Sequence, residues 1–234
     1  MFTKYLIAMV IGLALAQDQY PEITIRENGE DKKVYIVQNS GTTPKGGDTL
    51  NVAWGQRAYL ANNASLGEDN FYGVNLLGGS ISYDVNLSAA GCSCNHAFYL
   101  VSMPGRDVNG KPSTGDFDDY YCDANKVGGQ WCPEFDIMEA NTFAWHSTPH
   151  KCDPANSKGH YFNCDRGGSC FQKALDINAT AYGPNSTYTI DTSKPFSVQI
   201  SFKLDAHFQV ELTQGNNSIS MASDESCTDY LTYM

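Results

Sequence analysis

The chain has few basic residues and almost no long apolar runs, and both shortages limit what it can do. It carries 15 Lys and Arg against 26 Asp and Glu, which gives a formal net charge of −11. Nucleic acids and anionic membranes would repel this charge, so neither is expected as a partner. Beyond residue 16 no apolar run reaches membrane-spanning length. Sequence repeats, coiled-coil heptads and long low-complexity tracts are also absent from the sequence.

The one marked apolar run lies at the N-terminus. Lys4 precedes an apolar stretch through Leu15, and Ala16 ends a small-residue site. This order is typical of a signal peptide, predicted here as 1–16 and cut after Ala16. We therefore expect a secreted, extracellular, soluble protein of residues 17–234, and a monomer. N-glycosylation sequons, expected on the surface, occur at Asn63, Asn86, Asn178, Asn185 and Asn216.

Eight cysteines in an exported chain favour disulfides. Zinc is the alternative, since Cys92, Cys94 and His96 form a C-x-C-x-H pattern and His146 and His150 are four residues apart. Such a site would have to form in an oxidising compartment from ligands on a strand. We therefore expect no metal.

The pattern of apolar residues predicts one all-β domain over 17–234. Short runs rich in Val, Ile, Tyr, Phe and Thr alternate with Gly, Asn, Asp and Pro clusters, which is typical of a β-sandwich. The expected strands include 33–37, 81–86, 97–103, 134–138 and 196–204. The stretches 104–129 and 153–168 are expected to be long loops over the sheets.

The most informative segment is 132–141, where Glu134, Asp136 and Glu139 are crowded into apolar, strand-forming sequence. On a regular strand Glu134 and Asp136 share a face and Glu139 points away. One β-bulge between Asp136 and Glu139 would bring all three to one face. The two glutamates would then lie roughly 5–5.5 Å apart, the separation that retaining glycosidases use for nucleophile and acid/base. Asp136 could then push the two glutamate pKa values apart.

A solvent-facing strand with an acidic edge is the simpler interpretation of these carboxylates. Such a strand would alternate its acids with Lys, Thr or Ser. The intervening residues are instead Phe135, Ile137 and Met138. A strand with one buried face and a groove on the other fits better.

The motif Glu-Phe-Asp-Ile-Met-Glu-Ala-Asn at 134–141, followed by Thr-Pro-His-Lys-Cys at 148–152, resembles the signature of glycoside hydrolase family 7. Further similarity occurs around 76–85, 92–103 and 182–196, so the resemblance covers roughly 76–227, whereas 17–71 matches poorly. It implies a jelly-roll β-sandwich of two curved antiparallel sheets, with long loops around a substrate cleft. Chains of this family extend further at the C-terminus, so we expect a short or C-terminally truncated member.

The resemblance also implies three disulfides, which join Cys122 to Cys132, Cys152 to Cys164, and Cys170 to Cys227. Cys92 and Cys94 remain. On a strand, their Cα atoms would lie close to 7 Å apart, at the limit for bridging. We predict that they are unpaired, or joined only by a strained bond.

Catalytic roles carried over from the family make Glu134 the nucleophile, Glu139 the acid/base and Asp136 the group that orients Glu134. Asn95 and Tyr99 match positions beside the nucleophile, although Tyr99 could equally be a core aromatic. 

Four further residues are expected to bind substrate or lie beside the leaving group. Asp123 and Asn125 match positions that line the cleft. His150 matches a histidine near the leaving group, where it would contact sugar or the acid/base; a loop histidine that caps backbone groups is the alternative. Trp145, between the catalytic strand and His150, could stack on a pyranose ring or lie in the core.

Together these features predict a retaining endo-β-1,4-glucanase that cleaves cellulose-like or mixed-linkage β-glucan without a cofactor. A cellobiohydrolase and a laminarinase-type β-glucanase are the enzymatic alternatives. From another class, a catalytically weak glucan-binding or interaction protein is possible, although the retention of all three carboxylates argues against it.

Overall fold

A computed structural model describes residues 20–37, 43–44 and 48–232. The predicted signal peptide lies outside the described residues. The chain divides into two compact units, one up to Leu66 and the other from Gly67 onward. This boundary lies close to residue 71, where the resemblance to the family begins to weaken in the sequence.

The first unit holds a small antiparallel sheet in the order β1-β2-β5. Strand β1 is Glu22–Glu27, β2 is Glu30–Val37 and β5 is Tyr59–Ala61. The hairpin between β1 and β2 turns at Asn28 and Gly29, both of which have positive φ. A separate pair joins β3, Thr43–Pro44, to β4, Leu50–Asn51.

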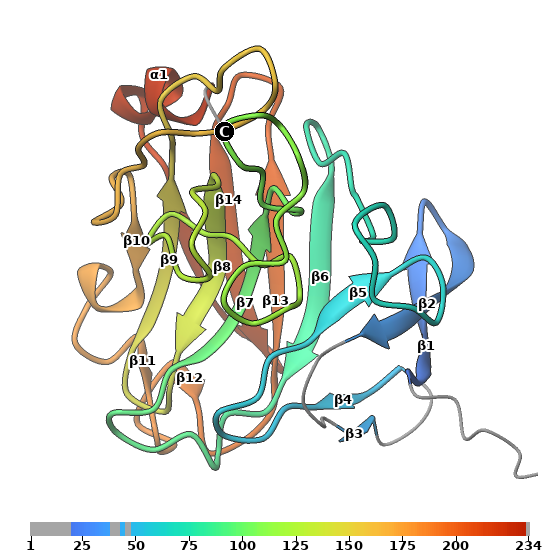
Figure 1. Ribbon diagram of the computed structural model, residues 1–234. Coiled ribbons are helices and arrows are strands. Elements are labelled where there is room, and N and C mark those ends of the chain that lie inside the picture. Colours follow the sequence, from blue (N-terminus) through green and yellow to red (C-terminus); the bar gives the residue numbers. More distant parts are fainter. Residues whose placement is uncertain (1–19, 38–42, 45–47, 233–234) are drawn as a thin grey trace, which may run out of the picture. The chain divides into compact units, whose positions relative to one another are not determined.

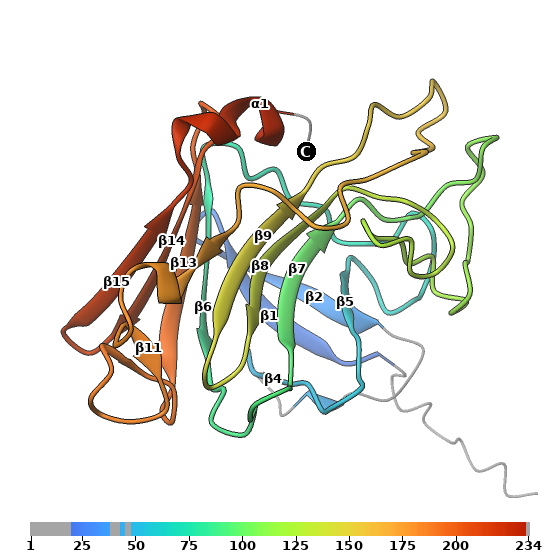
Figure 2. The same cartoon turned by 90° about the vertical axis from the view of Figure 1, so that its left-hand side faces the viewer.

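The second unit is built from two four-stranded antiparallel sheets (Figures 1 and 2). One has the order β10-β9-β8-β7, with β7 at His96–Val101, β8 at Glu134–Ala140, β9 at Trp145–His150 and β10 at Gln172–Lys173. The other has the order β15-β14-β13-β6, with β6 at Ser80–Val85, β13 at Phe196–Phe202, β14 at Phe208–Gln214 and β15 at Asn217–Ala222. The two layers face each other in Figure 2, which confirms the predicted β-sandwich.

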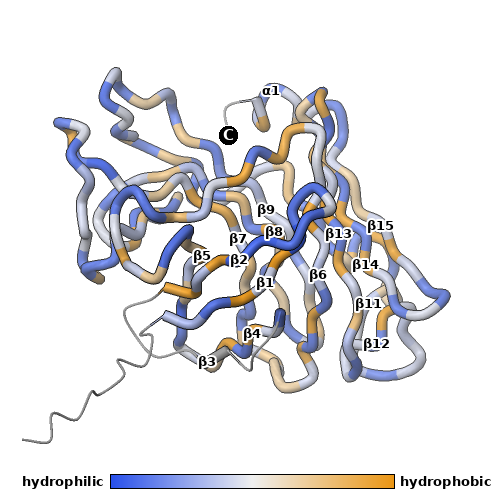
Figure 3. Tube along the Cα trace, turned by 90° about the vertical axis from the view of Figure 1, so that its right-hand side faces the viewer, coloured by the Kyte–Doolittle hydropathy of each residue, from blue (hydrophilic) through white to orange (hydrophobic). Residues whose placement is uncertain are grey.

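The core lies between these two sheets. Phe135 of β8 packs edge-on against Phe208 of β14, with ring centroids 4.9 Å apart. Along β13 and β14 buried residues alternate with more exposed ones, and the hydropathy colouring of Figure 3 shows the same interleaving. This period of two is the pattern expected of strands with one face on a core.

The remaining elements are short. They are the parallel pair β11, Tyr182–Gly183, and β12, Ile190–Asp191; the 3-10 helices η1, Ala174–Asp176, and η2, Glu225–Cys227; and the helix α1, Thr228–Leu231. Over the described part of the chain, no helix has both the length and the apolar character needed to cross a bilayer. The stretches 104–129 and 153–168 contain only isolated bridges, as expected of long loops.

All three predicted disulfides are present: Cys122–Cys132, Cys152–Cys164 and Cys170–Cys227. Cys92 and Cys94 are free thiols, which also agrees with the prediction. Ser93 between them has a positive φ of 72°. The backbone therefore turns between the two cysteines, and they do not lie on the regular strand assumed from the sequence.

Candidate active site

Strand β8 contains the predicted bulge. Its register with β9 shifts between Asp136 and Glu139, where three residue steps on β8 correspond to two on β9. The register with β7 shifts at the same place, since Tyr99 pairs with Asp136 and Phe98 with Met138. Ile137 is the extra residue, and both Ile137 and Met138 are buried in the core. Two consecutive core residues restore the parity, so Glu139 returns to the face of Glu134 and Asp136.

Side chains from β9 stabilise the bulge. The Ser147 hydroxyl donates a hydrogen bond of 2.6 Å to the Ile137 carbonyl, and the Trp145 Nε1–H donates to the Ser147 hydroxyl oxygen at 3.2 Å. Ser147 and Trp145 are both buried. A bulged residue leaves the regular ladder, so its buried carbonyl needs such a partner.

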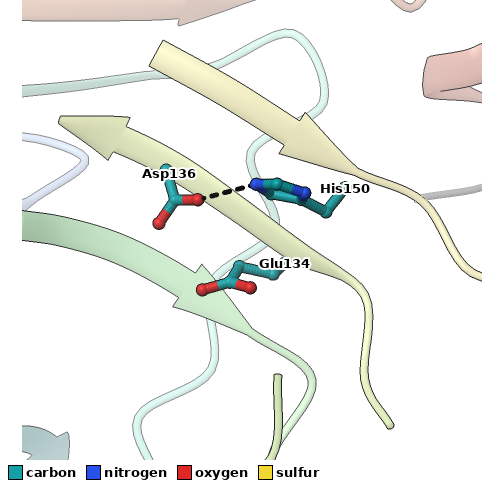
Figure 4. Close-up of side chains that lie close together, drawn as sticks. All are labelled: Glu134, Asp136 and His150. Carbon is teal, nitrogen blue, oxygen red and sulfur yellow. Dashed lines mark ion pairs between the residues drawn. The ribbon is translucent and has the colours of Figure 1, made fainter. Parts of the chain in front are cut away.

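The three carboxylates line one pocket of about 390 Å³ on the outer face of this sheet. Its other lining residues come from β9, β10 and two loops: Asn125, His146, Thr148, His150, Arg166, Gly167, Phe171 and Lys173. Figure 4 shows Glu134 and Asp136 on β8 with His150 beside them on β9. The pocket therefore contains the three carboxylates that the sequence predicts to be catalytic.

Glu134 is buried and only 7% exposed. One of its oxygens, Oε2, accepts a hydrogen bond of 3.1 Å from the backbone N–H of Ala124. Burial, and next the charge of Asp136, raise the pKa of Glu134 to about 8, against the opposing effects of the Ala124 N–H and of His150. A fixed backbone donor holds the carboxylate in one orientation.

Asp136 and His150 form a buried pair. Asp136 Oδ2 lies 3.1 Å from His150 Nε2 (Figure 4), and the opposite ring nitrogen, Nδ1, lies 2.9 Å from the Asp165 carbonyl oxygen. Because a carbonyl only accepts, Nδ1 carries a proton and Nε2 faces the carboxylates. Burial favours the neutral imidazole, but the hydrogen bonds to Asp136 and to the Asp165 carbonyl raise the pKa of His150 to about 9. Burial raises the pKa of Asp136, and His150 opposes that shift.

Glu139 is half-buried and differs from Glu134 in its partner. The Asn95 amide, on the loop before β7, donates a hydrogen bond of 2.9 Å to Glu139 Oε1. Asn95 was expected beside the nucleophile, Glu134, and the structure places it instead on the proposed acid/base. His150 also differs from expectation, because it contacts Asp136 rather than Glu139.

The other predicted site residues fall into two groups. Asn125 lines the pocket, whereas Asp123 is buried beneath it and accepts hydrogen bonds from the backbone N–H groups of Asn125 and Val127, both at 2.9 Å. Tyr99 packs edge-on against Tyr121 at 6.4 Å and is not among the lining residues of the pocket.

The structure corrects the expectation that Trp145 stacks on a sugar ring. Its side chain is 1% exposed and packs against Tyr182 and Phe196 in the core, so it has no face free for a sugar. The strand alternation explains this, since Trp145 lies one residue before His146, which lines the pocket.

Four pocket residues were not predicted to bind substrate, namely His146, Arg166, Phe171 and Lys173, and His146 was considered only as a zinc ligand. The only signal in the sequence was their position next to the catalytic strand and the cysteines Cys164 and Cys170. Strand β10 is two residues long, too short for a periodicity to show.

One metal-type cluster is present in the pocket. Ligand atoms of Glu134, Asp136 and His150 lie within 4.8 Å of one another, so a cation could fit among them. Within the described ranges, the two zinc arrangements considered from the sequence, Cys92–Cys94–His96 and His146–His150, do not gather into such a group.

Residues 108–218 match the sequence profile of glycosyl hydrolase family 7. The sequence is also 28% identical over 184 residues to the endo-beta-1,4-glucanase celB of Emericella nidulans, and 29% identical over 175 residues to endoglucanase 1 of Pyricularia oryzae. Residues 108–218, which include every residue that lines the pocket, thus carry the sequence pattern of glycosyl hydrolase family 7.

The similarity to these relatives extends over only part of their length. Each alignment covers 64% of the chain but only 43% of the Emericella protein and 40% of the Pyricularia protein. The fold is similar to that of Humicola insolens Cel7B glycosynthase mutants, with a TM-score of 0.64 at 18% identity, over 92% of this chain and 79% of that one. This likeness establishes the jelly-roll β-sandwich.

Proposed function

We propose that the chain is a retaining endo-β-1,4-glucanase of cellulose-like or mixed-linkage β-glucan. The observation that carries this proposal is the bulge of β8, which brings Glu134, Asp136 and Glu139 into one pocket. A binding protein needs no such arrangement of paired carboxylates. The names of the curated relatives, an endo-beta-1,4-glucanase and an endoglucanase, support the substrate and the endo mode of cleavage.

In the first step Glu134 attacks the anomeric carbon and Glu139 protonates the leaving glycosidic oxygen. Glu134 is suited to attack because the Ala124 N–H orients its carboxylate. Glu139 is suited to proton transfer because it is more exposed and can exchange protons with water, while Asn95 holds its Oε1. The step forms a glycosyl ester on Glu134 and releases the shortened chain.

In the second step Glu139 takes a proton from water, which attacks the same carbon and frees Glu134. The Asp136–His150 pair lies beside Glu134 in both steps. Burial raises the pKa values of Glu134 and Asp136, and the pair can hold a proton that would otherwise reside on Glu134. Its role is to position and tune Glu134 rather than to react. The mechanism requires no cofactor.

We also propose that the protein is secreted and monomeric. The predicted signal peptide 1–16 and the three disulfides support export to an oxidising compartment. The net charge of −11 is compatible with a neutral polysaccharide.

The test is product analysis with the purified protein on a panel of β-glucans. An endoglucanase shortens long chains before small sugars accumulate, whereas a cellobiohydrolase releases disaccharide from the start. NMR of the earliest products should show the β-anomer, because in retaining glycosidases the two carboxylates lie roughly 5–5.5 Å apart and leave no space for a water opposite the acid. An α-anomer formed first would refute the retaining mechanism, and binding without cleavage would favour the glucan-binding alternative.

A further inference from the structure

The leaving-group side of the pocket carries a cationic and aromatic rim that catalysis does not use. Across β8, β9 and β10, Glu139 pairs with His146 and His146 pairs with Lys173. Residues paired in this way point to the same face of a sheet, so Lys173 faces the pocket two strands from Glu139. Two strand spacings amount to roughly 9.6 Å. Lys173 thus faces the pocket on the β10 side of the proposed acid/base, Glu139.

Lys173 lies next to an exposed aromatic ring. Its Nζ lies over one face of the Phe171 ring, 4.2 Å from the centroid, and Phe171 is 43% exposed although it lines the pocket. The opposite face of the ring could then serve as a platform for the C–H face of a sugar. The neighbouring ammonium group then lies beside the substituents of that sugar.

No carboxylate lies within ion-pair distance of the Lys173 ammonium anywhere in the described part of the chain. Arg166, on the loop before Cys170, lines the same pocket and is likewise without such a pair among those residues. The same pocket also holds Glu134, Asp136 and Glu139, so Lys173 and Arg166 are a positively charged part of an otherwise acidic pocket.

We propose that this rim is a leaving-group subsite for a sugar that carries a carboxylate, such as a uronic acid within or attached to a β-glucan. Phe171 stacks on the ring and Lys173 pairs with the carboxylate. The inference rests on the proposed function, because it takes Glu139 as the acid that marks the leaving-group side. It makes acidic β-glucans better substrates than neutral ones.

The experiment uses two matched β-1,4-linked oligosaccharides, one with glucuronic acid and one with glucose as the leaving sugar. The wild-type protein should show a higher kcat/KM for the acidic substrate. Lys173→Gln should reduce the acidic-to-neutral ratio by about two- to fivefold, the range of an exposed ion pair. High salt should have the same effect on the wild type.

Two further variants separate the contributions. Lys194→Gln is the matched control, because Lys194 pairs with Asp191 at 2.8 Å and does not line the pocket, so the ratio should remain unchanged. Phe171→Ala should lower kcat/KM for both substrates alike, and Phe171→Tyr should restore it.

An unchanged ratio in Lys173→Gln would overturn the inference. If Lys173 only balances the charge of the catalytic carboxylates, this variant will shift the pH profile for both substrates and leave the ratio intact, which also refutes the subsite. If the neutral substrate is not cleaved, the proposed function fails. Calorimetric binding of both oligosaccharides to the wild type and Lys173→Gln then still tests the subsite.

Discussion

At the scale of single residues, the roles of Glu134 and Glu139 can be separated by chemistry. Gln at either position should lower kcat by more than about 10²-fold, because each change removes a covalent or a proton-transfer step. Asp136→Asn should cost less, since Asp136 does not react. Glu211→Gln, on β14 away from the pocket, is a matched control.

Reaction with azide distinguishes the nucleophile from the acid/base. With an activated aryl glycoside, Glu139→Ala should yield a β-glycosyl azide, because azide attacks the glycosyl ester on Glu134. Glu134→Ala should yield an α-glycosyl azide, since azide then replaces the nucleophile. Exchanged outcomes would reverse the two roles, and wild-type turnover in either variant would refute the site.

We expect His150 to set the pH dependence of the proposed activity. As an imidazolium it lowers the pKa values of both Glu134 and Asp136. Removing it in His150→Asn should raise both values, so the ionised nucleophile would appear only at higher pH. The acidic limb of the kcat/KM profile should therefore move upward.

The structure offers a matched control for this change. His207 and Asp205 form a second pair at 3.1 Å outside the pocket, so His207→Asn should leave the profile in place. An acidic limb that stays fixed or moves downward in His150→Asn would contradict the proposed influence of His150 on the carboxylates.

At the scale of elements, the bulge of β8 depends on Ser147. In Ser147→Ala the buried Ile137 carbonyl loses its hydroxyl donor, which should cost about 1–3 kcal/mol of unfolding free energy. The same change should lower kcat, because the bulge sets the direction of Glu139. Denaturant titration and steady-state kinetics measure both effects, with Ser220→Ala on β15 as control. Full activity combined with lost stability would show that the bulge persists without this bond.

The bulge was predictable from parity alone, since three carboxylates two and three residues apart cannot share a face on a regular strand. The disulfides followed from the resemblance to the family. The role of Trp145 could not be predicted, because a buried tryptophan and a sugar platform look alike in sequence. Phe171 and Lys173 were missed because they reach the pocket through a pairing with β9 that is set by tertiary structure.

At the scale of the whole second unit, the Cys170–Cys227 bridge links the segment before β10 to η2 across 57 residues. Replacing both cysteines by Ser should lower stability by about 2–5 kcal/mol, as for other native bridges. Replacing the free thiols Cys92 and Cys94 by Ser should change stability little. Thermal unfolding and non-reducing peptide mapping check both expectations. A bridge from Cys92 or Cys94 to another cysteine would contradict the structure.

The extra residue at Ile137 also sets how the length of β8 can change over evolutionary time. With Ile137 deleted, the remaining sequence Glu-Phe-Asp-Met-Glu alternates regularly, so Glu139 would stay on the face of Glu134 and Asp136 without a bulge. A regular ladder that kept every residue would instead turn Glu139 into the apolar core, where an unpaired carboxylate is strongly disfavoured. Relatives that keep all three carboxylates should therefore either retain the bulge or lack one residue between Asp136 and Glu139.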